Sequence, residues 1–72
     1  MEIFEKLKKD GYRYIIMPKK SRIRFWATKD KMKKDNTFKD STIFKEFRLT
    51  TNLEKRAFNE VLPKDVFINI TK

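Results

Sequence analysis

The chain has 72 residues, with 19 Lys or Arg against 10 Asp or Glu and with neither Cys nor His. That length fits one small domain, and without Cys or His there are no disulfides, thiol nucleophiles, zinc sites or Ser-His-Asp triads. The net charge of +9 predicts an anionic partner, while the carboxylates are scattered without a D-x-D pair. We therefore expect a binding module, not an enzyme, with no cofactor, metal or small-molecule substrate.

The sequence contains no pattern typical of a membrane or secreted protein. The longest apolar run, residues 14–17, is far too short to span a bilayer. Residues 1–5 lack the basic and apolar regions of a signal peptide. We expect a cytoplasmic protein with no membrane partner. The abundance of Lys and the scarcity of Ala and Gly suggest an AT-rich genome, as in many phages and low-GC bacteria.

Residues 2–9 are predicted to form a short amphipathic helix. Ile3, Phe4 and Leu7 share one face of that helix, which favours packing on the core over lying on a membrane. Glutamates lie in its first turn and lysines in its last turn, as the helix macrodipole favours. Gly11, the only glycine, is expected to end the helix in a left-handed conformation.

Residues 12–17 and 23–26 predict a β-hairpin, because both runs are aromatic and β-branched and Pro18 starts a turn between them. Pairing Met17 with Arg22 sorts the side chains of both strands onto two faces. The apolar, core face would carry Tyr12, Tyr14, Ile16, Ile23, Phe25 and Ala27. The other face would carry Arg13, Ile15, Met17, Arg22, Arg24, Trp26 and Thr28. A slip of one residue in one strand would spoil this sorting.

Residues 29–42 are mostly polar and predict a mobile basic loop, although a short helical turn would also fit. Only Met32 and Phe38 could anchor this stretch to the rest of the domain. Residues 43–49 fit a strand with two sets of alternating side chains, although the pair Ile43 and Phe47 would also suit a helix. The strand is favoured because Thr50 and Thr51 follow and Thr51 starts a helix.

A second helix is predicted to begin at Thr51, because Thr51 and Glu54 form a capping box, and to end before Pro63. Its core stripe is expected to consist of Leu53, Ala57 and Val61, flanked by Phe58 and Leu62. Alternation in residues 66–71 predicts a last strand. The resulting order, α-β-β-β-α-β, predicts a small single α+β domain over residues 1–72, with both helices on one face of a mostly antiparallel sheet.

The order α-β-β-β-α in a basic chain of this size is similar to that of the double-stranded RNA-binding domain. Residues 51–56, however, lack the Lys-rich start of that family's last helix, and the final strand is extra. The resemblance is one of topology, so no residue role is carried over from it.

The positive charge is concentrated in one part of the sequence. Residues 13–34 hold nine basic residues and one acidic residue, a net charge of +8, whereas residues 1–12 are neutral and residues 35–72 carry +1. Such clustering favours a binding patch over an evenly solvated surface. The candidate site residues are Arg13, Lys19, Lys20, Arg22, Arg24, Trp26, Lys29, Lys31, Lys33 and Lys34.

These residue types suit nucleic acid. Guanidinium groups bind phosphates through paired hydrogen bonds, an exposed Trp can stack on a base, and a two-stranded ribbon fits the major groove. Other interpretations stay open at this point. Trp26 could be a core residue or lie beneath Arg13 in a cation–π contact, and the Lys-rich loop could be a solvated linker.

The sequence therefore predicts a small nucleic-acid-binding module, for DNA or RNA. The alternative is a phage- or mobile-element-encoded inhibitor that docks its basic patch on an acidic surface of a host protein. An exposed apolar patch formed by Ile15, Met17 and Trp26 would favour the protein partner.

Overall fold

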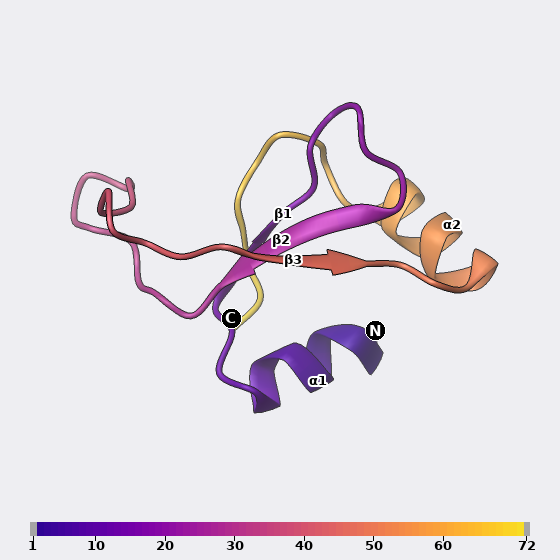
Figure 1. Cartoon of the computed structure of the whole chain (residues 1–72), viewed down its shortest axis with the longest axis horizontal. Helices are drawn as coiled ribbons and strands as arrows, with labels where there is room; N and C mark the ends of the chain where they lie inside the picture. Colours follow the sequence, from indigo (N-terminus) through magenta and orange to yellow (C-terminus); the bar gives the residue numbers. More distant parts are fainter. Residues whose placement is uncertain (1, 72) are drawn as a thin grey trace.

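The computed structural model describes residues 2–71, and its elements follow the predicted order (Figure 1). They are α1 (Glu2–Lys9), β1 (Tyr14–Ile16), β2 (Arg24–Thr28), β3 (Lys45–Arg48), α2 (Asn52–Val61) and β4 (Ile68–Asn69). The four strands form one sheet in the order β3-β2-β1-β4, and every neighbouring pair is antiparallel. The predicted α+β class is confirmed.

The predicted hairpin register is wrong by three residues. Ile15 lies opposite Ala27 and Ile16 lies opposite Trp26. Because the shift is an odd number, β1 is turned over relative to the prediction. Ile15 and Met17, predicted on the outer face, are only 1% and 2% exposed, whereas Tyr14 takes a place on the outer face. Phe25 and Ala27 of β2 are buried as predicted.

Contacts from distant residues explain the shifted register. The connection between β1 and β2 has seven residues, 17–23, instead of four. The backbone N–H of Asp65 donates to the Met17 carbonyl at 2.9 Å, and the Asp65 carboxylate accepts the Lys19 N–H at 2.7 Å. The Ser21 hydroxyl bonds both the N–H and the carbonyl of Arg24. A wide turn leaves backbone N–H and carbonyl groups without partners in the sheet. These bonds satisfy such groups, so the wide turn is stable in place of a tight hairpin.

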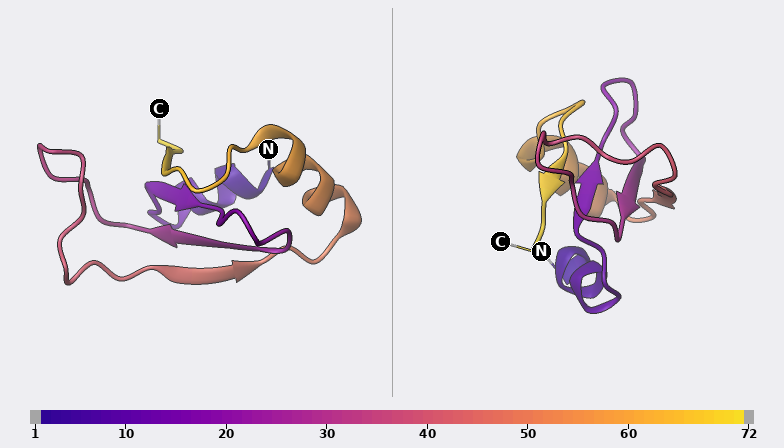
Figure 2. Two further views of the ribbon diagram at one scale, coloured as in Figure 1. Left: turned by 90° about the horizontal axis from the view of Figure 1, so that it is seen from above. Right: turned by 90° about the vertical axis from the view of Figure 1, so that its left-hand side faces the viewer.

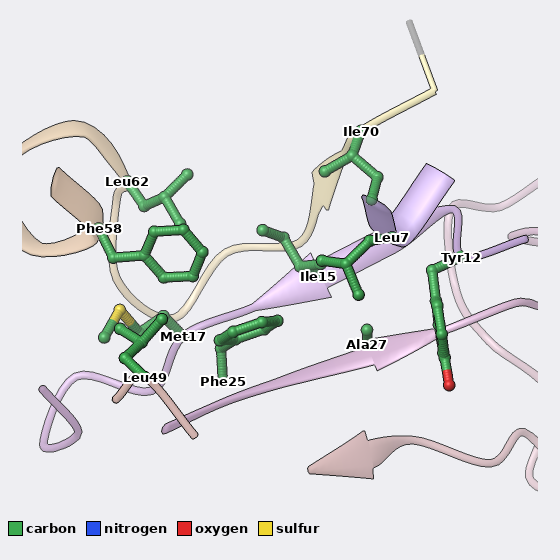
Figure 3. Packing of buried hydrophobic residues seen from close by; sticks show 10 residues of the cluster. All are labelled: Leu7, Tyr12, Ile15, Met17, Phe25, Ala27, Leu49, Phe58, Leu62 and Ile70. Atoms are coloured by element: carbon green, nitrogen blue, oxygen red, sulfur yellow. The ribbon is translucent and has the colours of Figure 1, made fainter. Parts of the chain in front are cut away.

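The core lies between one face of the sheet and the two helices (Figure 3). Phe25 of β2 and Phe58 of α2 are fully buried, with ring centroids 5.0 Å apart. Phe4 of α1 packs on the same Phe58 ring at 5.5 Å, and Leu7 is buried beside the sheet. Burial of each Phe stabilises the fold by about 1.5–3 kcal/mol, so these rings join both helices to the sheet.

The local signals around α1 and α2 are confirmed. Gly11 has φ 98° after the end of α1. The Thr51 hydroxyl accepts the Glu54 N–H at 3.1 Å, and the Glu54 carboxylate accepts the Thr51 N–H at 3.3 Å. The Thr51 hydroxyl also lowers the pKa of Glu54 by hydrogen bonding to its carboxylate. Within residues 2–71 no helix has the length and apolar content needed to cross a membrane.

The predicted core stripe of α2 is wrong. Leu53 and Val61 are 78% and 66% exposed, whereas Phe58 and Leu62 are buried. The two stripes are neighbours on the helix, so either could face the sheet. The large Phe58 ring removes more apolar area from water than Val61 would, and it decides which stripe turns inward.

The loop and the last strand complete the domain. Residues 29–44 contain turns but no helix, and they extend toward one end of the molecule (Figure 2). The mobility predicted for residues 29–42 stays a prediction, although Phe38 is packed against other rings. β4 is shorter than predicted, yet it places Ile70 in the core.

Candidate functional site

The sheet face opposite the helices carries a second cluster of aromatic side chains. Phe38 from the loop lies at its centre, with ring centroids 5.4 Å from Tyr14, 5.3 Å from Phe44 and 4.8 Å from Phe67. Sequence reasoning missed this cluster because it assigned Tyr14 to the core. In the observed register, Tyr14 lies on the same face as Trp26. The available signal was the alternation of side chains along β1, which places Tyr14 and Ile15 on opposite faces.

Beside this cluster is a hollow that we call the apolar pocket. It has a volume of about 330 Å³ and is lined by Ile16, Pro18, Trp26, Phe44 and Phe67. None of these side chains is charged. Because Phe38 packs on both Phe44 and Phe67, two walls of the pocket are held in place by ring contacts.

A second hollow, the turn pocket, adjoins the apolar pocket and shares Pro18 and Trp26 with it. Its volume is about 380 Å³, and it is lined by Pro18, Lys20, Ser21, Arg22, Ile23, Arg24 and Trp26. Three of the seven residues are basic and none is acidic. Trp26 therefore stands at the border between an apolar surface and a cationic one.

A third hollow, the helix pocket, continues the cationic surface from the turn to α2. It is lined by Arg22, Ile23, Lys55, Arg56 and Asn59. The Asn59 side-chain amide donates to the Arg22 carbonyl at 2.9 Å, which ties the turn to the helix. The turn and helix pockets together present five basic side chains, Lys20, Arg22, Arg24, Lys55 and Arg56.

Lys64 connects the turn to α2. Its ammonium group donates to the Asn59 side-chain oxygen at 2.7 Å and to the Ser21 carbonyl at 3.0 Å, and it contacts the Met17 sulfur at 3.2 Å. Burial lowers the pKa of Lys64, and the nearby Arg22 charge lowers it further. The nearby Asp65 carboxylate acts in the opposite direction on the pKa of Lys64, so Arg22 and Lys64 repel one another only in part.

The cations are only weakly neutralised by the protein itself. Arg24 lies 3.7 Å from Glu46 on β3, and both side chains are about half exposed. Exposed ion pairs of this kind contribute at most about 1 kcal/mol. Arg24 is therefore free to exchange Glu46 for a more highly charged anion such as a phosphate.

The structure brings together only part of the predicted site. Lys20, Arg22, Arg24 and Trp26 meet at the turn pocket. Lys19 belongs to the same turn but does not line the pocket, and its backbone N–H is bound to Asp65.

The other predicted residues lie elsewhere. Arg13 precedes β1, at the end of that strand away from the turn. Lys29 follows β2 and lies over the Tyr12 ring at 5.1 Å. Lys31, Lys33 and Lys34 are exposed on the loop, at the opposite end of β2 from the turn (Figure 1). The single basic face predicted from the sequence is therefore two separate basic regions.

Sequence reasoning missed the contribution of the C-terminal half. Lys55, Arg56 and Lys64 lie in a segment whose charges nearly cancel along the sequence, so no local excess marked them. Their proximity to Arg22 follows from the docking of α2 beside the turn. No pattern within the helix itself predicts that neighbour.

Trp26 is half-buried and its ring is not capped by a cation. Within residues 2–71 the cation–π contacts join Lys29 to Tyr12 and Lys45 to Phe47, so the alternative in which Trp26 lies beneath Arg13 is not the one adopted. The Trp26 indole N–H also has no hydrogen-bond partner among residues 2–71. Neither the ring face nor the N–H is therefore engaged by another side chain of the described residues.

In the part of the chain that the structure describes, no three acidic side chains gather as they would around a metal ion. Comparison with models of known protein families, with curated proteins and with solved structures finds no match to this chain. The function is therefore inferred from the geometry of the three pockets.

Proposed function

We propose that the protein is a small nucleic-acid-binding module that contacts phosphates with the basic side chains around the β1–β2 turn. The observation that carries this proposal is the continuous cationic surface of the turn and helix pockets. Five basic residues and no acidic residue line the two pockets, Glu46 lies beside Arg24 in an exposed ion pair, and the surface borders Trp26.

The chemistry of these side chains supports a phosphate ligand. Arg22, Arg24 and Arg56 can each donate two parallel hydrogen bonds to phosphate oxygens, and all three are exposed. Lysines 20 and 55 add point charges beside them. The five residues of β2 separate the turn from the loop lysines, and a strand of this length spans about 17 Å at 3.3 Å per residue. A polymer of several nucleotides could therefore contact both the turn and the loop.

The alternative, an acidic surface of a host protein, loses one supporting argument. It required an exposed apolar patch formed by Ile15, Met17 and Trp26. Ile15 and Met17 are buried, so these three residues do not form that patch. Binding to a host protein is therefore one of the outcomes that the experiment below distinguishes.

The experiment is fluorescence anisotropy with labelled single- and double-stranded DNA and RNA across a series of salt concentrations. Neutralising five phosphates predicts that log K falls with log salt at a slope of about −3.5 to −4.5. The variant Arg22→Glu/Arg24→Glu should bind more than about tenfold more weakly. Circular dichroism should show an unchanged fold, because both side chains are exposed.

The matched control is Lys6→Glu/Lys39→Glu, which changes the net charge by the same amount at two exposed positions outside the three pockets. It should lose much less affinity than the turn variant. Equal losses in both variants, or binding that does not respond to salt, would contradict the proposal. A partner protein that stays bound to the chain after nuclease treatment, with no nucleic-acid binding, would favour the host-protein alternative.

A further inference from the structure

We propose that the apolar pocket takes an unpaired base, so that the ligand is a single-stranded nucleic acid with one base beside Trp26 and its phosphates in the turn pocket. This inference rests on the proposed function and adds to it the strandedness of the ligand. It follows from the lining of the apolar pocket, from its position next to the turn pocket, and from the state of the Trp26 ring.

The lining of the apolar pocket does not suit a phosphate. All five lining residues are apolar, and none offers a side-chain donor other than the Trp26 indole N–H. A phosphate moved into such a site would lose its hydration without compensating hydrogen bonds. A nucleobase, in contrast, has two flat faces that gain from contact with aromatic and aliphatic side chains, and polar edges that can reach the indole N–H.

The position of this pocket explains why one ligand would occupy both sites. Trp26 and Pro18 line the apolar pocket and also line the cationic turn pocket. A ligand that fills both must place a flat apolar group directly beside an anion. A nucleotide does so because one sugar joins its base to its phosphate. In a duplex the faces of the bases are stacked on one another, so only an unpaired base can enter the apolar pocket.

Trp26 can contact a base without any rearrangement of the residues around it. Its ring has no cation–π partner and its N–H no hydrogen-bond partner within residues 2–71. The rings of Phe44 and Phe67 are held by contacts with Phe38, which does not itself line the pocket. The pocket is therefore formed before binding, which reduces the entropy lost when a base enters.

The sole Trp of the chain is Trp26, so intrinsic fluorescence reports on the border between the apolar pocket and the turn pocket. A strand without bases distinguishes occupation of the two pockets. The experiment titrates the full chain at one moderate salt concentration with three probes of equal length: a single strand, its duplex, and a single strand with abasic sites. Single strands are supplied as both DNA and RNA. We expect the single strand to quench Trp26 and to bind about tenfold or more tightly than the abasic strand, because stacking on an aromatic ring favours each base by such a factor. Quenching by either DNA or RNA, when it is stronger than quenching by the abasic strand, supports the proposal.

The variant Trp26→Ala separates the base contact from the phosphate contacts. Measured by anisotropy, it should bind the single strand about 5- to 100-fold more weakly than the wild type but bind the abasic strand equally well. Trp26→Phe, which keeps an aromatic ring, should recover most of the loss. The wild-type comparison of single and abasic strands needs no variant and so tests the proposal even if Trp26→Ala does not fold.

The outcomes distinguish this inference from the proposed function. Equal affinity for all three probes, without quenching, would overturn the base site and leave phosphate binding in place. A duplex that binds more tightly than the single strand would also overturn it. If no oligonucleotide binds, both proposals fail, and tighter binding of poly-glutamate than of every oligonucleotide would assign the surface to an acidic protein instead.

Discussion

Lys64 shows how one side chain sets the shape of the candidate site. Its ammonium group bonds Ser21 in the turn and Asn59 in α2, so it fixes the distance between the turn pocket and the helix pocket. Asp65 next to it bonds Lys19, and these two residues together hold both ends of the turn. The site thus depends on residues that do not themselves face the ligand.

We expect Lys64→Met to lower the free energy of unfolding by about 1–2 kcal/mol, because the Ser21 and Asn59 oxygens lose a charged donor. Urea denaturation measures this change. Anisotropy should show weaker nucleic-acid binding, because the turn is no longer tied to α2. A variant with unchanged stability and unchanged affinity would contradict this role of Lys64.

The difference in stability between the wild type and Lys64→Met is expected to depend on pH. Burial and the Arg22 charge lower the pKa of Lys64 below 10.5, so the unfolded chain binds this proton more tightly than the folded chain. Stability then rises with pH between the lowered pKa and 10.5. The stability of the wild type relative to Lys64→Met should therefore increase as the pH rises toward 10.5, which denaturation at several alkaline pH values tests.

Among the elements, the loop between β2 and β3 is tied to the rest of the domain by two rings. Phe38 contacts Tyr14, Phe44 and Phe67, and Phe44 packs on Phe67, while most other loop side chains are exposed. The loop lines the apolar pocket through Phe44 and also carries the second basic region. Its order and the shape of the pocket depend on the same ring contacts.

We expect Phe38→Ala to release this loop and to lower stability by about 1–3 kcal/mol, because a half-buried ring with three aromatic neighbours is removed. Limited trypsin digestion followed by mass spectrometry should show faster cleavage after Lys31, Lys33 and Lys34 than in the wild type. Ser41→Ala, at an exposed position of the same loop, is the control and should leave the cleavage pattern nearly unchanged. Equal cleavage rates in wild type and Phe38→Ala would show that the ring does not anchor the loop.

On the scale of the whole molecule, a small core carries most of the stability. Ten buried apolar residues connect the sheet to both helices, with Phe25 and Phe58 fully buried at the centre. A single core in a domain of this length supplies no more than about 3–5 kcal/mol. One substitution at the centre can therefore remove the entire margin.

Phe58→Ala is expected to cost about 3–5 kcal/mol and to leave the chain largely unfolded at 25 °C. Leu53→Ala on the same helix should change stability by less than about 0.5 kcal/mol, because Leu53 is exposed. Circular dichroism during thermal unfolding measures both variants. A larger loss for Leu53→Ala would mean that the predicted stripe of Leu53, Ala57 and Val61, and not the Phe58 side, packs on the sheet.

The sequence by itself determined the features that depend on neighbours along the chain. The end of α1 at Gly11, the capping box of Thr51 and Glu54, and the order of the elements all follow from local backbone and side-chain chemistry. The cationic residues of the turn and the presence of Trp26 beside them were also visible, because they are close in sequence.

Only the tertiary structure decided the hairpin register, the inward face of α2 and the composition of the site. Each depended on contacts between distant residues: Asp65 with Met17, Phe58 with Phe25, and Asn59 with Arg22. The local pattern favoured a different register and a different helix stripe, and the free energy of these long-range contacts outweighs that local preference. The same docking of α2 placed Lys55 and Arg56 beside the turn, so the cationic surface is a property of the fold and not of one segment.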